Sequence, residues 1–327
     1  MNTSTTAAII FGFGLIINCS IITKTNIPSK SENTHANAVA AKTGFNQNFS
    51  MMPNMTEALY KNIQKLKPQI LRYPGGTVSD SWDWRKGVIE TRNSKSVHKI
   101  NEIKTLTDYT NAKFVFVLDI LNKPLSDQIE MLKEIEKLDV SIDYIELGNE
   151  LYAQEDDYKR IFPTGKDYAE RVNEWTPLLR QNFPKAKIAA LLLGRKVRES
   201  NVRMYQWNRQ VVDNTISNID AYTYHIYINK NSTFEQEKAD FIEVSNNAQT
   251  KQKEIWITEY GNKQDKSDPT YYTELNSLAD FVETFQNVTI ALNHQIIGGT
   301  KNKLTDDGNS FVEEGLLYLK RVKEQKP

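Results

Sequence analysis

The sequence predicts an α/β protein that folds as a single (β/α)8 TIM barrel. Short apolar strand segments alternate regularly with amphipathic helical segments from residue 38 onward, and polar side chains gather where strand segments end. Several strand segments are apolar on both faces, as parallel strands covered by helices must be. Eight strand–helix units fit into residues 38–327, which is the usual size of such a barrel.

The first half of the pattern holds four strand segments and the helices between them. A weak strand lies within 39–49, and stronger ones span 69–76, 114–120 and 142–148. Helical spacing of apolar residues predicts helices over 56–66, 97–110 and 125–138. Pro68 ends the first helix, and Pro-Gly-Gly closes the second strand segment before a polar and aromatic loop over 77–87.

The second half repeats the alternation. Strand segments span 187–194, 219–228, 254–260 and 288–296, and helical segments span 166–182, 202–217, 233–250, 272–286 and 310–324. A doubly wound open sheet is the structural alternative. It is disfavoured because no strand segment leads into a Gly-x-Gly-x-x-Gly turn and because the polar clusters are spread over many strand ends.

The N-terminus differs from the rest of the chain. Residues 1–22 have the character of a signal peptide or a lipoprotein signal, with an apolar run from Ala7 to Ile17 that is too short to span a bilayer. Cys19, the only cysteine, follows this run as a lipid-acceptor cysteine would. Residues 23–37 have the composition of a flexible linker. We therefore expect an exported protein, with lipid attachment at Cys19 left open.

Composition narrows the class of partner. Lys+Arg and Asp+Glu are equal at 41 each, so the overall charge favours neither nucleic acid nor a membrane surface as a partner. Only four histidines occur, and none are paired at metal-ligand spacing. No Gly-x-Ser-x-Gly turn and no phosphate-binding loop is present. We expect no metal and no organic cofactor.

Two glutamates end apolar strand segments and are the strongest candidates for catalysis. Glu150 closes the segment IDYIELGNE directly after Asn149, and Glu259 lies at the end of EIWITEY. In a (β/α)8 barrel the C-terminal strand ends surround one site. Glu146 also points inward by strand periodicity, and we interpret it as the structural partner of a buried arginine.

Other strand ends would supply the rest of this site. The candidates are Arg72, Trp82, Trp84, His225, Tyr227, Asn293 and His294. Two carboxyl groups on opposite sides of a pocket suit cleavage of a glycosidic bond, where one holds a proton and the other attacks the sugar. Trp82 or Trp84 could stack on a sugar ring or could instead anchor the loop to the barrel. The basic run around Arg195 could meet an acidic sugar, although a solvated loop is the simpler interpretation.

The sequence resembles clan A glycoside hydrolases, because Asn-Glu ends the fourth strand segment and a glutamate ends the seventh. LRYPGG followed by WDWRKG is similar to the strand-2 region of arabinofuranosidases, heparanase-like glucuronidases and agarase-like enzymes. The resemblance implies a retaining enzyme that cleaves a β-type bond in a polysaccharide or oligosaccharide. It also implies Glu150 as acid/base, Glu259 as nucleophile, Asn149 on the sugar 2-hydroxyl and Arg72 supporting the nucleophile.

One departure and two alternatives accompany this resemblance. Clan A enzymes usually end strand 8 with a tryptophan, whereas this chain has Leu292-Asn293-His294 there, so we expect the strand-8 end and the loop 77–87 to decide specificity. The first alternative function is a non-catalytic glycan-binding barrel, such as a surface lipoprotein. The second is a lyase that uses one glutamate as a base.

Overall fold

The computed structural model describes residues 40–49, 52–90, 96–297, 305 and 310–324. The chain divides into two units, Met1–Asn37 and Ala38–Pro327, and all described residues lie in the second. The signal segment 1–22 and the linker 23–37 predicted from the sequence are therefore outside the described residues. Within the described part, no helix has the length and apolar character needed to cross a membrane.

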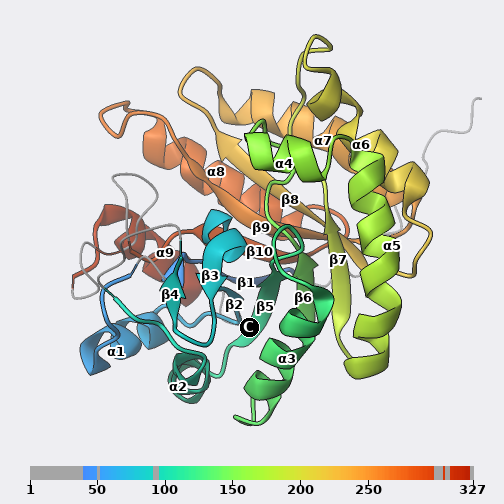
Figure 1. Cartoon of the computed structure of the whole chain (residues 1–327). Coiled ribbons are helices and arrows are strands. Elements are labelled where there is room, and N and C mark those ends of the chain that lie inside the picture. The colour runs from blue at the N-terminus through green and yellow to red at the C-terminus, as the bar shows by residue number, and fades with distance from the viewer. Residues whose placement is uncertain (1–39, 50–51, 91–95, 298–304, 306–309, 325–327) are drawn as a thin grey trace, which may run out of the picture. The chain divides into compact units, whose positions relative to one another are not determined.

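Eight parallel strands close into a barrel, which confirms the predicted (β/α)8 fold (Figure 1). Around the barrel their order is β1, β10, β9, β8, β7, β6, β5 and β2, so each strand lies beside its neighbour in the chain and β1 pairs with β10. The strands are β1 (Lys42–Asn46), β2 (Ile70–Tyr73), β5 (Lys113–Leu118), β6 (Tyr144–Leu147), β7 (Lys187–Leu191), β8 (Ala221–Ile228), β9 (Glu254–Asn262) and β10 (Val288–His294).

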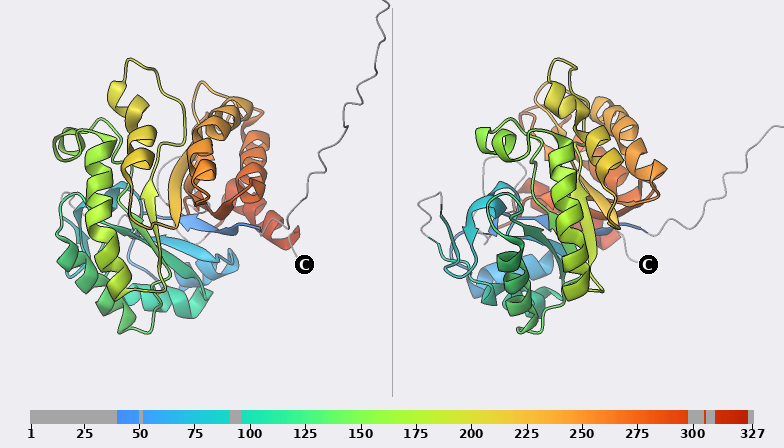
Figure 2. Two further views of the ribbon diagram at one scale, coloured as in Figure 1. Left: turned by 90° about the vertical axis from the view of Figure 1, so that its right-hand side faces the viewer. Right: turned by 45° about the vertical axis from the view of Figure 1, so that its right-hand side comes forward.

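Helices cover the outside of the barrel, as two further views show (Figure 2). Their apolar faces pack on the outward-facing residues of the strands and form the larger hydrophobic core. One short helix, α4, was not predicted and precedes α5 in the connection from β6 to β7. The helices are α1 (Glu57–Lys65), α2 (Asn101–Thr110), α3 (Leu125–Glu136), α4 (Asp156–Ile161), α5 (Gly165–Asn182), α6 (Val202–Asn214), α7 (Phe234–Thr250), α8 (Tyr271–Thr284) and α9 (Glu313–Glu324).

The inside of the barrel is a smaller apolar core with a polar layer above it. The apolar layer consists of Ile70, Val115, Tyr144, Ala189, Ala221, Trp256, Ile290 and Leu292. Two residues further along three of these strands, toward their C-terminal ends, lie Arg72, Glu146 and Thr258, which are all buried. Because side chains alternate between the two faces of a strand, these three also point into the barrel. They support the site at the barrel mouth.

The loop predicted over 77–87 has regular structure, which corrects the sequence interpretation. It contains a short 3-10 helix, Thr77–Ser81, followed by the antiparallel strands β3 (Trp82–Asp83) and β4 (Val88–Ile89). Trp82 is 4% exposed and meets the ring of Tyr73 edge-on at 5.2 Å. Burial of Trp82 anchors the hairpin to the barrel. This contact explains why a polar stretch without a periodic pattern forms regular structure here.

Candidate active site

Arg72 is the centre of the polar layer and holds the site together. Its guanidinium is fully buried and donates to Glu146 Oε2 at 2.6 Å and to Glu259 Oε1 at 2.7 Å. It also donates to Asn46 Oδ1 at 3.0 Å and Asn149 Oδ1 at 2.9 Å. The predicted pairing of Glu146 with a buried arginine is confirmed. Since a buried guanidinium needs acceptors on all sides, this network fixes the carboxylate of Glu259 in one position.

A β-bulge turns Glu259 toward the barrel interior. On β8, Tyr224 and His225 are consecutive, but their partners on β9 are Ile257 and Glu259, so β9 has one extra residue. The register between β9 and β10 shifts at the same place. As a result Thr258 and Glu259 both contact interior groups, although strict alternation would turn one of them outward. Thr258 donates to Glu146 Oε1 at 3.0 Å, while Glu259 meets Arg72.

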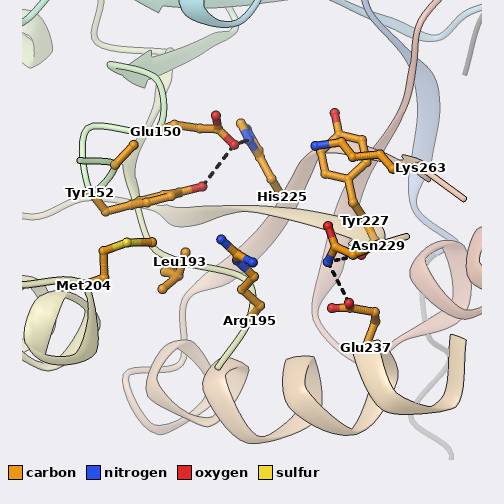
Figure 3. Close-up of a pocket in the computed structure, with 11 residues that line it drawn as sticks. Glu150, Tyr152, Leu193, Arg195, Met204, His225, Tyr227, Asn229, Glu237 and Lys263 are labelled. Atoms are coloured by element: carbon orange, nitrogen blue, oxygen red, sulfur yellow. Dashed lines mark hydrogen bonds and ion pairs between the residues drawn. The ribbon is translucent and has the colours of Figure 1, made fainter. Parts of the chain in front are cut away.

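Glu150 reaches the site from a turn that follows β6. The strand ends at Leu147, and Gly148 (φ 93°) and Glu150 (φ 46°) both adopt left-handed backbone conformations. The side chain of Glu150 accepts a hydrogen bond from Tyr152 at 3.3 Å and contacts His225 Nδ1 at 2.8 Å (Figure 3). Periodicity of the strand therefore does not place Glu150; the tight turn does.

The two glutamates predicted to act together face each other across the barrel mouth. One carboxylate oxygen of Glu150, one of Glu259 and a ring nitrogen of His225 all lie within 4.8 Å of one another. His225 Nδ1 is 3.6 Å from Glu259 Oε2, which also accepts a hydrogen bond from the Tyr227 hydroxyl at 2.6 Å. His225 and Tyr227 are two residues apart on β8, and this spacing points both into the site.

The surroundings hold Glu259 in its charged form. Burial alone would raise the pKa of Glu259, but the charges of His225, His294 and Arg72 and the hydrogen bond from Tyr227 outweigh it and lower the pKa to about 2. A carboxylate that stays ionised and is fixed in position is suited to nucleophilic attack.

Glu150 and His225 share a proton-binding site. Burial opposes charge on both groups, yet the hydrogen bond and charge of His225 lower the pKa of the Glu150 carboxyl. Burial would also lower the pKa of His225, but the negative charges of Glu259 and Glu150 raise it. Both shifts favour the charged forms of the pair, a carboxylate at Glu150 and an imidazolium at His225. The side chain of Glu150 is 36% exposed, compared with 9% for Glu259, so Glu150 faces the open cleft.

His294 lies in the site, as predicted from the strand-8 end. Its Nδ1 is 2.7 Å from Asn46 Nδ2, and its ring meets that of Tyr227 edge-on at 6.0 Å. Burial, reinforced by the nearby Lys263, lowers the pKa of His294 despite the charge of Glu259. The partly buried imidazole at this position can exchange hydrogen bonds with a ligand.

Three predicted substrate-binding residues do not line the site. Trp82 and Trp84 both belong to the hydrophobic core, and Trp84 donates to Asp127 of α3 at 3.3 Å. The alternative interpretation, that they anchor the loop, is the one the structure supports. The prediction that Asn293 contacts the substrate is also wrong. Its neighbours Leu292 and His294 face inward, so Asn293 faces the helices and hydrogen-bonds to Tyr260.

The sequence interpretation missed three residues that shape the site. Asn46 ends β1 and accepts a hydrogen bond from Arg72. The only sequence signal for it is its position at the C-terminal end of a barrel strand, where site residues lie. Tyr152 follows Glu150 by two residues in the turn. Gly76 lies against Glu259, because a Cβ added there would be 2.7 Å from Glu259 Oε1 and 3.3 Å from Asn149 Oδ1. Only glycine leaves that carboxylate in place.

The cluster of Glu150, His225 and Glu259 also has the donor types of a metal site. The charge balance disfavours that interpretation. Glu259 is already paired with the guanidinium of Arg72, and the ammonium of Lys263 lies 3.5 Å from the ring centroid of Tyr227. A divalent cation here would be repelled by both positive charges.

Residues 169–296 match the family model of a glycosyl hydrolase catalytic core. This match supports the predicted enzyme class, glycoside hydrolase. The matched segment includes His225, Tyr227 and Glu259, while Glu150 precedes it. Among curated proteins, no sequence matches this chain.

Solved structures with the same barrel support the resemblance to clan A enzymes. An α-L-arabinofuranosidase from Thermotoga maritima is 14% identical, with a TM-score of 0.54 over 80% of this chain and 64% of that enzyme. A family 51 α-L-arabinofuranosidase from Bifidobacterium longum is 12% identical, with a TM-score of 0.60 over 82% and 70% of the two chains. A fungal β-1,4-galactanase is 12% identical, with a TM-score of 0.60 over 86% of this chain and 100% of that one.

This chain thus spans less than two thirds of the Thermotoga enzyme's length. At such identities the likeness establishes the fold and leaves the substrate open. A carbohydrate substrate is implied by the glycosyl hydrolase core itself.

Proposed function

We propose that this protein is a retaining glycoside hydrolase in which Glu259 is the nucleophile and Glu150 the acid/base. The supporting observation is that their carboxylate oxygens approach within 4.8 Å. Retaining enzymes place the two carboxyl groups about 5–5.5 Å apart, whereas inverting enzymes leave about 6.5–9.5 Å for a water molecule. The short separation therefore favours covalent double displacement.

In the first step, a carboxylate oxygen of Glu259 forms a bond to the anomeric carbon while the glycosidic bond breaks. The departing oxygen takes the proton of the Glu150 carboxyl group. In the second step, Glu150 removes a proton from water, the water oxygen bonds to the anomeric carbon, and the ester to Glu259 breaks. Both glutamates return to their starting forms.

His225 supplies the proton that Glu150 needs. In the resting site the proton is on the imidazole, whose Nδ1 is 2.8 Å from Glu150 Oε1. A bound sugar would cover the exposed side of Glu150 and remove water from its carboxylate, which favours the neutral acid. The proton then moves the short distance from Nδ1 to the carboxylate, next to the glycosidic oxygen.

The substrate we propose is a polysaccharide or its oligosaccharides, with Asn149 and His294 contacting the sugar at the cleaved bond. We keep the β-type bond as a proposal. The similar structures include arabinofuranosidases named for α-L linkages and a galactanase named for β-1,4 linkages. A substrate panel must therefore contain both kinds of linkage.

The test combines product analysis with labelling of the enzyme. A panel of neutral and acidic oligosaccharides is incubated with the protein, and nuclear magnetic resonance follows the anomer that forms first. Retention is expected, and a fluorinated glycosyl inactivator should label Glu259. Inversion, or a label on another residue, would refute the assignment. Binding without any hydrolysis would favour the non-catalytic barrel, and an unsaturated product would indicate a lyase.

We also propose that the protein is exported and that Cys19 carries a lipid. The support is the apolar run from Ala7 to Ile17 followed by that single cysteine. Metabolic labelling with a fatty acid should mark the full-length protein and should not mark a Cys19→Ser variant. A labelled Cys19→Ser variant, or an unlabelled secreted protein, would overturn the lipid attachment.

A further inference from the structure

A pocket of about 210 Å³ opens beside Glu150 (Figure 3). Two of its lining residues, His225 and Tyr227, also contact Glu259. Its lining includes Glu150, Tyr152 and His225 but does not include Glu259. In the proposed mechanism the acid/base contacts the oxygen of the leaving group, whereas the nucleophile contacts the sugar that becomes attached. Because Glu150 lines this pocket and Glu259 does not, the pocket is on the side of the cleft where the leaving group would depart.

The pocket continues into a second groove of about 360 Å³ along the β7–α6 connection. Arg195 and Met204 line both cavities, so the two are adjoining. The second groove is lined further by Lys196 and Arg198. An oligosaccharide that leaves the cleaved bond through the first pocket would run past these three cationic residues.

Arg195 and Arg198 differ from the other arginines that the structure describes. Each of the others is hydrogen-bonded to a carboxylate or a backbone carbonyl, as Arg72, Arg180 and Arg203 are, or ion-paired, as Arg209 is with Asp213. Neither Arg195 nor Arg198 has a side-chain hydrogen bond or ion pair to another described residue, and both are exposed. Two unpaired guanidinium groups beside a cleft are free to donate hydrogen bonds to the acceptor groups of a ligand.

The acidic groups near this groove are already occupied. Glu237 lines the first pocket, but its Oε1 accepts from Asn229 at 2.7 Å and from Ser232 at 2.6 Å. Lys196 is paired with Glu243 at 2.5 Å, so its charge is partly neutralised. Lys263 adds positive charge on the pocket wall. Among the residues that the structure describes, the second groove is lined by three cationic residues and no acidic one, in a chain whose total charge is zero.

We propose that the leaving-group side binds an acidic glycan through Arg195 and, one unit further along, Arg198. This inference rests on the proposed function, because it identifies the leaving-group side by the role of Glu150. The planar guanidinium donates two parallel hydrogen bonds to a carboxylate or a sulfate ester, so either a uronic acid or a sulfated sugar supplies the required chemistry.

Binding to an inactive Glu259→Gln variant tests the inference without turnover. The probes are oligogalacturonate, a carrageenan oligosaccharide and a neutral β-1,4-galacto-oligosaccharide of equal length, measured by calorimetry. At least one acidic probe should bind about tenfold or more tighter than the neutral one, since hydrogen bonds to charged groups contribute about 1.5–3 kcal/mol. Comparing the two acidic probes separates carboxylate from sulfate.

Replacing Arg195 or Arg198 should abolish the tighter binding of the acidic probe. Adding Arg195→Ala or Arg198→Ala should weaken binding of the preferred acidic probe about tenfold and leave the neutral probe unchanged. Raising NaCl from about 50 mM to about 300 mM should weaken it further through screening. The matched control is Arg209→Ala, which removes an exposed charge from α6 outside the groove and should change nothing. Equal binding of all probes, or no effect of Arg195→Ala, overturns the proposal.

Turnover separates this inference from the proposed function. If the wild-type protein hydrolyses neutral oligosaccharides as fast as acidic ones, the acidic preference is wrong and the glycosidase assignment stands. If acidic probes bind through Arg195 but no glycoside is hydrolysed, the catalytic assignment is wrong and the acidic binding site stands. Arg195→Ala should raise KM for an acidic substrate by a larger factor than KM for a neutral one of equal length.

Discussion

Glu150 and Glu259 carry the same chemical group into one site, but their surroundings differ. The side chain of Glu259 is 9% exposed and is held by Arg72 and Tyr227, both within 2.7 Å of its oxygens. The side chain of Glu150 is 36% exposed and depends on His225 and a long contact with Tyr152. These surroundings fit the two proposed roles, a fixed charged nucleophile at Glu259 and a more accessible acid/base at Glu150.

The comparison also shows what each residue requires from the barrel. Glu259 needs a rigid position, and the buried guanidinium, the bulge in β9 and the close approach of Gly76 provide it. Glu150 needs contact with both substrate and a proton source, and a turn at the cleft edge provides that. Five predictions test this division, beginning with the largest effect.

Replacing Glu259 with Gln should have the largest effect on activity. Gln keeps a similar shape and one acceptor oxygen but cannot form the covalent bond, so kcat should fall by at least about 10⁴-fold. Steady-state kinetics measures the loss, and circular dichroism checks that the fold is retained. A variant with more than about a hundredth of wild-type activity would contradict the role of nucleophile.

Replacing Glu150 with Ala should have an effect that depends on the leaving group. With a sugar leaving group, the first step should slow by about 10²–10⁴-fold, because protonation is lost. With a good aryl leaving group, which departs without a proton, the first step should be nearly unchanged and the glycosyl-enzyme should accumulate. Burst kinetics distinguishes the two cases, and equal losses on both substrates would contradict the acid/base role.

Replacing Tyr227 with Phe should sharpen the assignment of the nucleophile. Loss of the hydrogen bond to Glu259 Oε2 should lower kcat about tenfold, since hydrogen bonds to charged groups contribute about 1.5–3 kcal/mol. It should also raise the pKa of Glu259, so the acidic limb of the kcat/KM profile should move to higher pH. Tyr222→Phe, on the same strand but facing the helices, is the matched control. An unmoved acidic limb argues against this contact.

Acid stability should report the low pKa of Glu259. Its pKa of about 2 in the folded protein is below its ordinary value of 4.5. The stability contributed by this group is therefore complete above pH 4.5 and is lost as the pH falls toward 2. Between about pH 5 and about pH 3, Tm should fall less steeply for Glu259→Gln than for the wild type. Parallel curves for the two proteins would show that Glu259 is not held in its charged form.

Replacing Trp84 with Phe should have the smallest effect on catalysis. Because Trp84 is buried and donates to Asp127, the variant should lose about 1–2 kcal/mol of stability. KM and kcat should each change less than about threefold. Thermal unfolding and kinetics measured on the same sample test this. A large rise in KM with unchanged Tm would show that Trp84 lines the cleft after all.

Much of this architecture could be predicted from local patterns. The alternation of strand and helix segments depends on apolar spacing, which is a property of short stretches, and it located all eight barrel strands. Asn149 and Glu150 were found because polar residues at a strand end are unusual in a core. The hairpin of β3 and β4 was missed because its order depends on burying Trp82 against Tyr73, a contact between segments.

The side chains that face the cleft were harder to predict than the strands that carry them. Asn293 and His294 are adjacent at the end of β10, yet one faces the helices and the other the site. Such a choice depends on the register of the whole strand, which begins at Val288. The prediction for Trp82 and Trp84 was wrong for a related reason. An indole ring can stack on a sugar, but in this fold both rings are packed in the core.

The amino-acid sequence by itself determined the barrel, the two strand-end glutamates and Arg72 as a residue of the site, because apolar periodicity and polar strand ends are local properties of the chain. Only the tertiary structure decided that Thr258 and Glu259 both turn inward. The cause is an extra residue in β9, which is recognised only from the pairing of β9 with β8 and β10. The low pKa of Glu259 has the same origin. It comes from charges on other strands, and these charges meet only when the barrel closes.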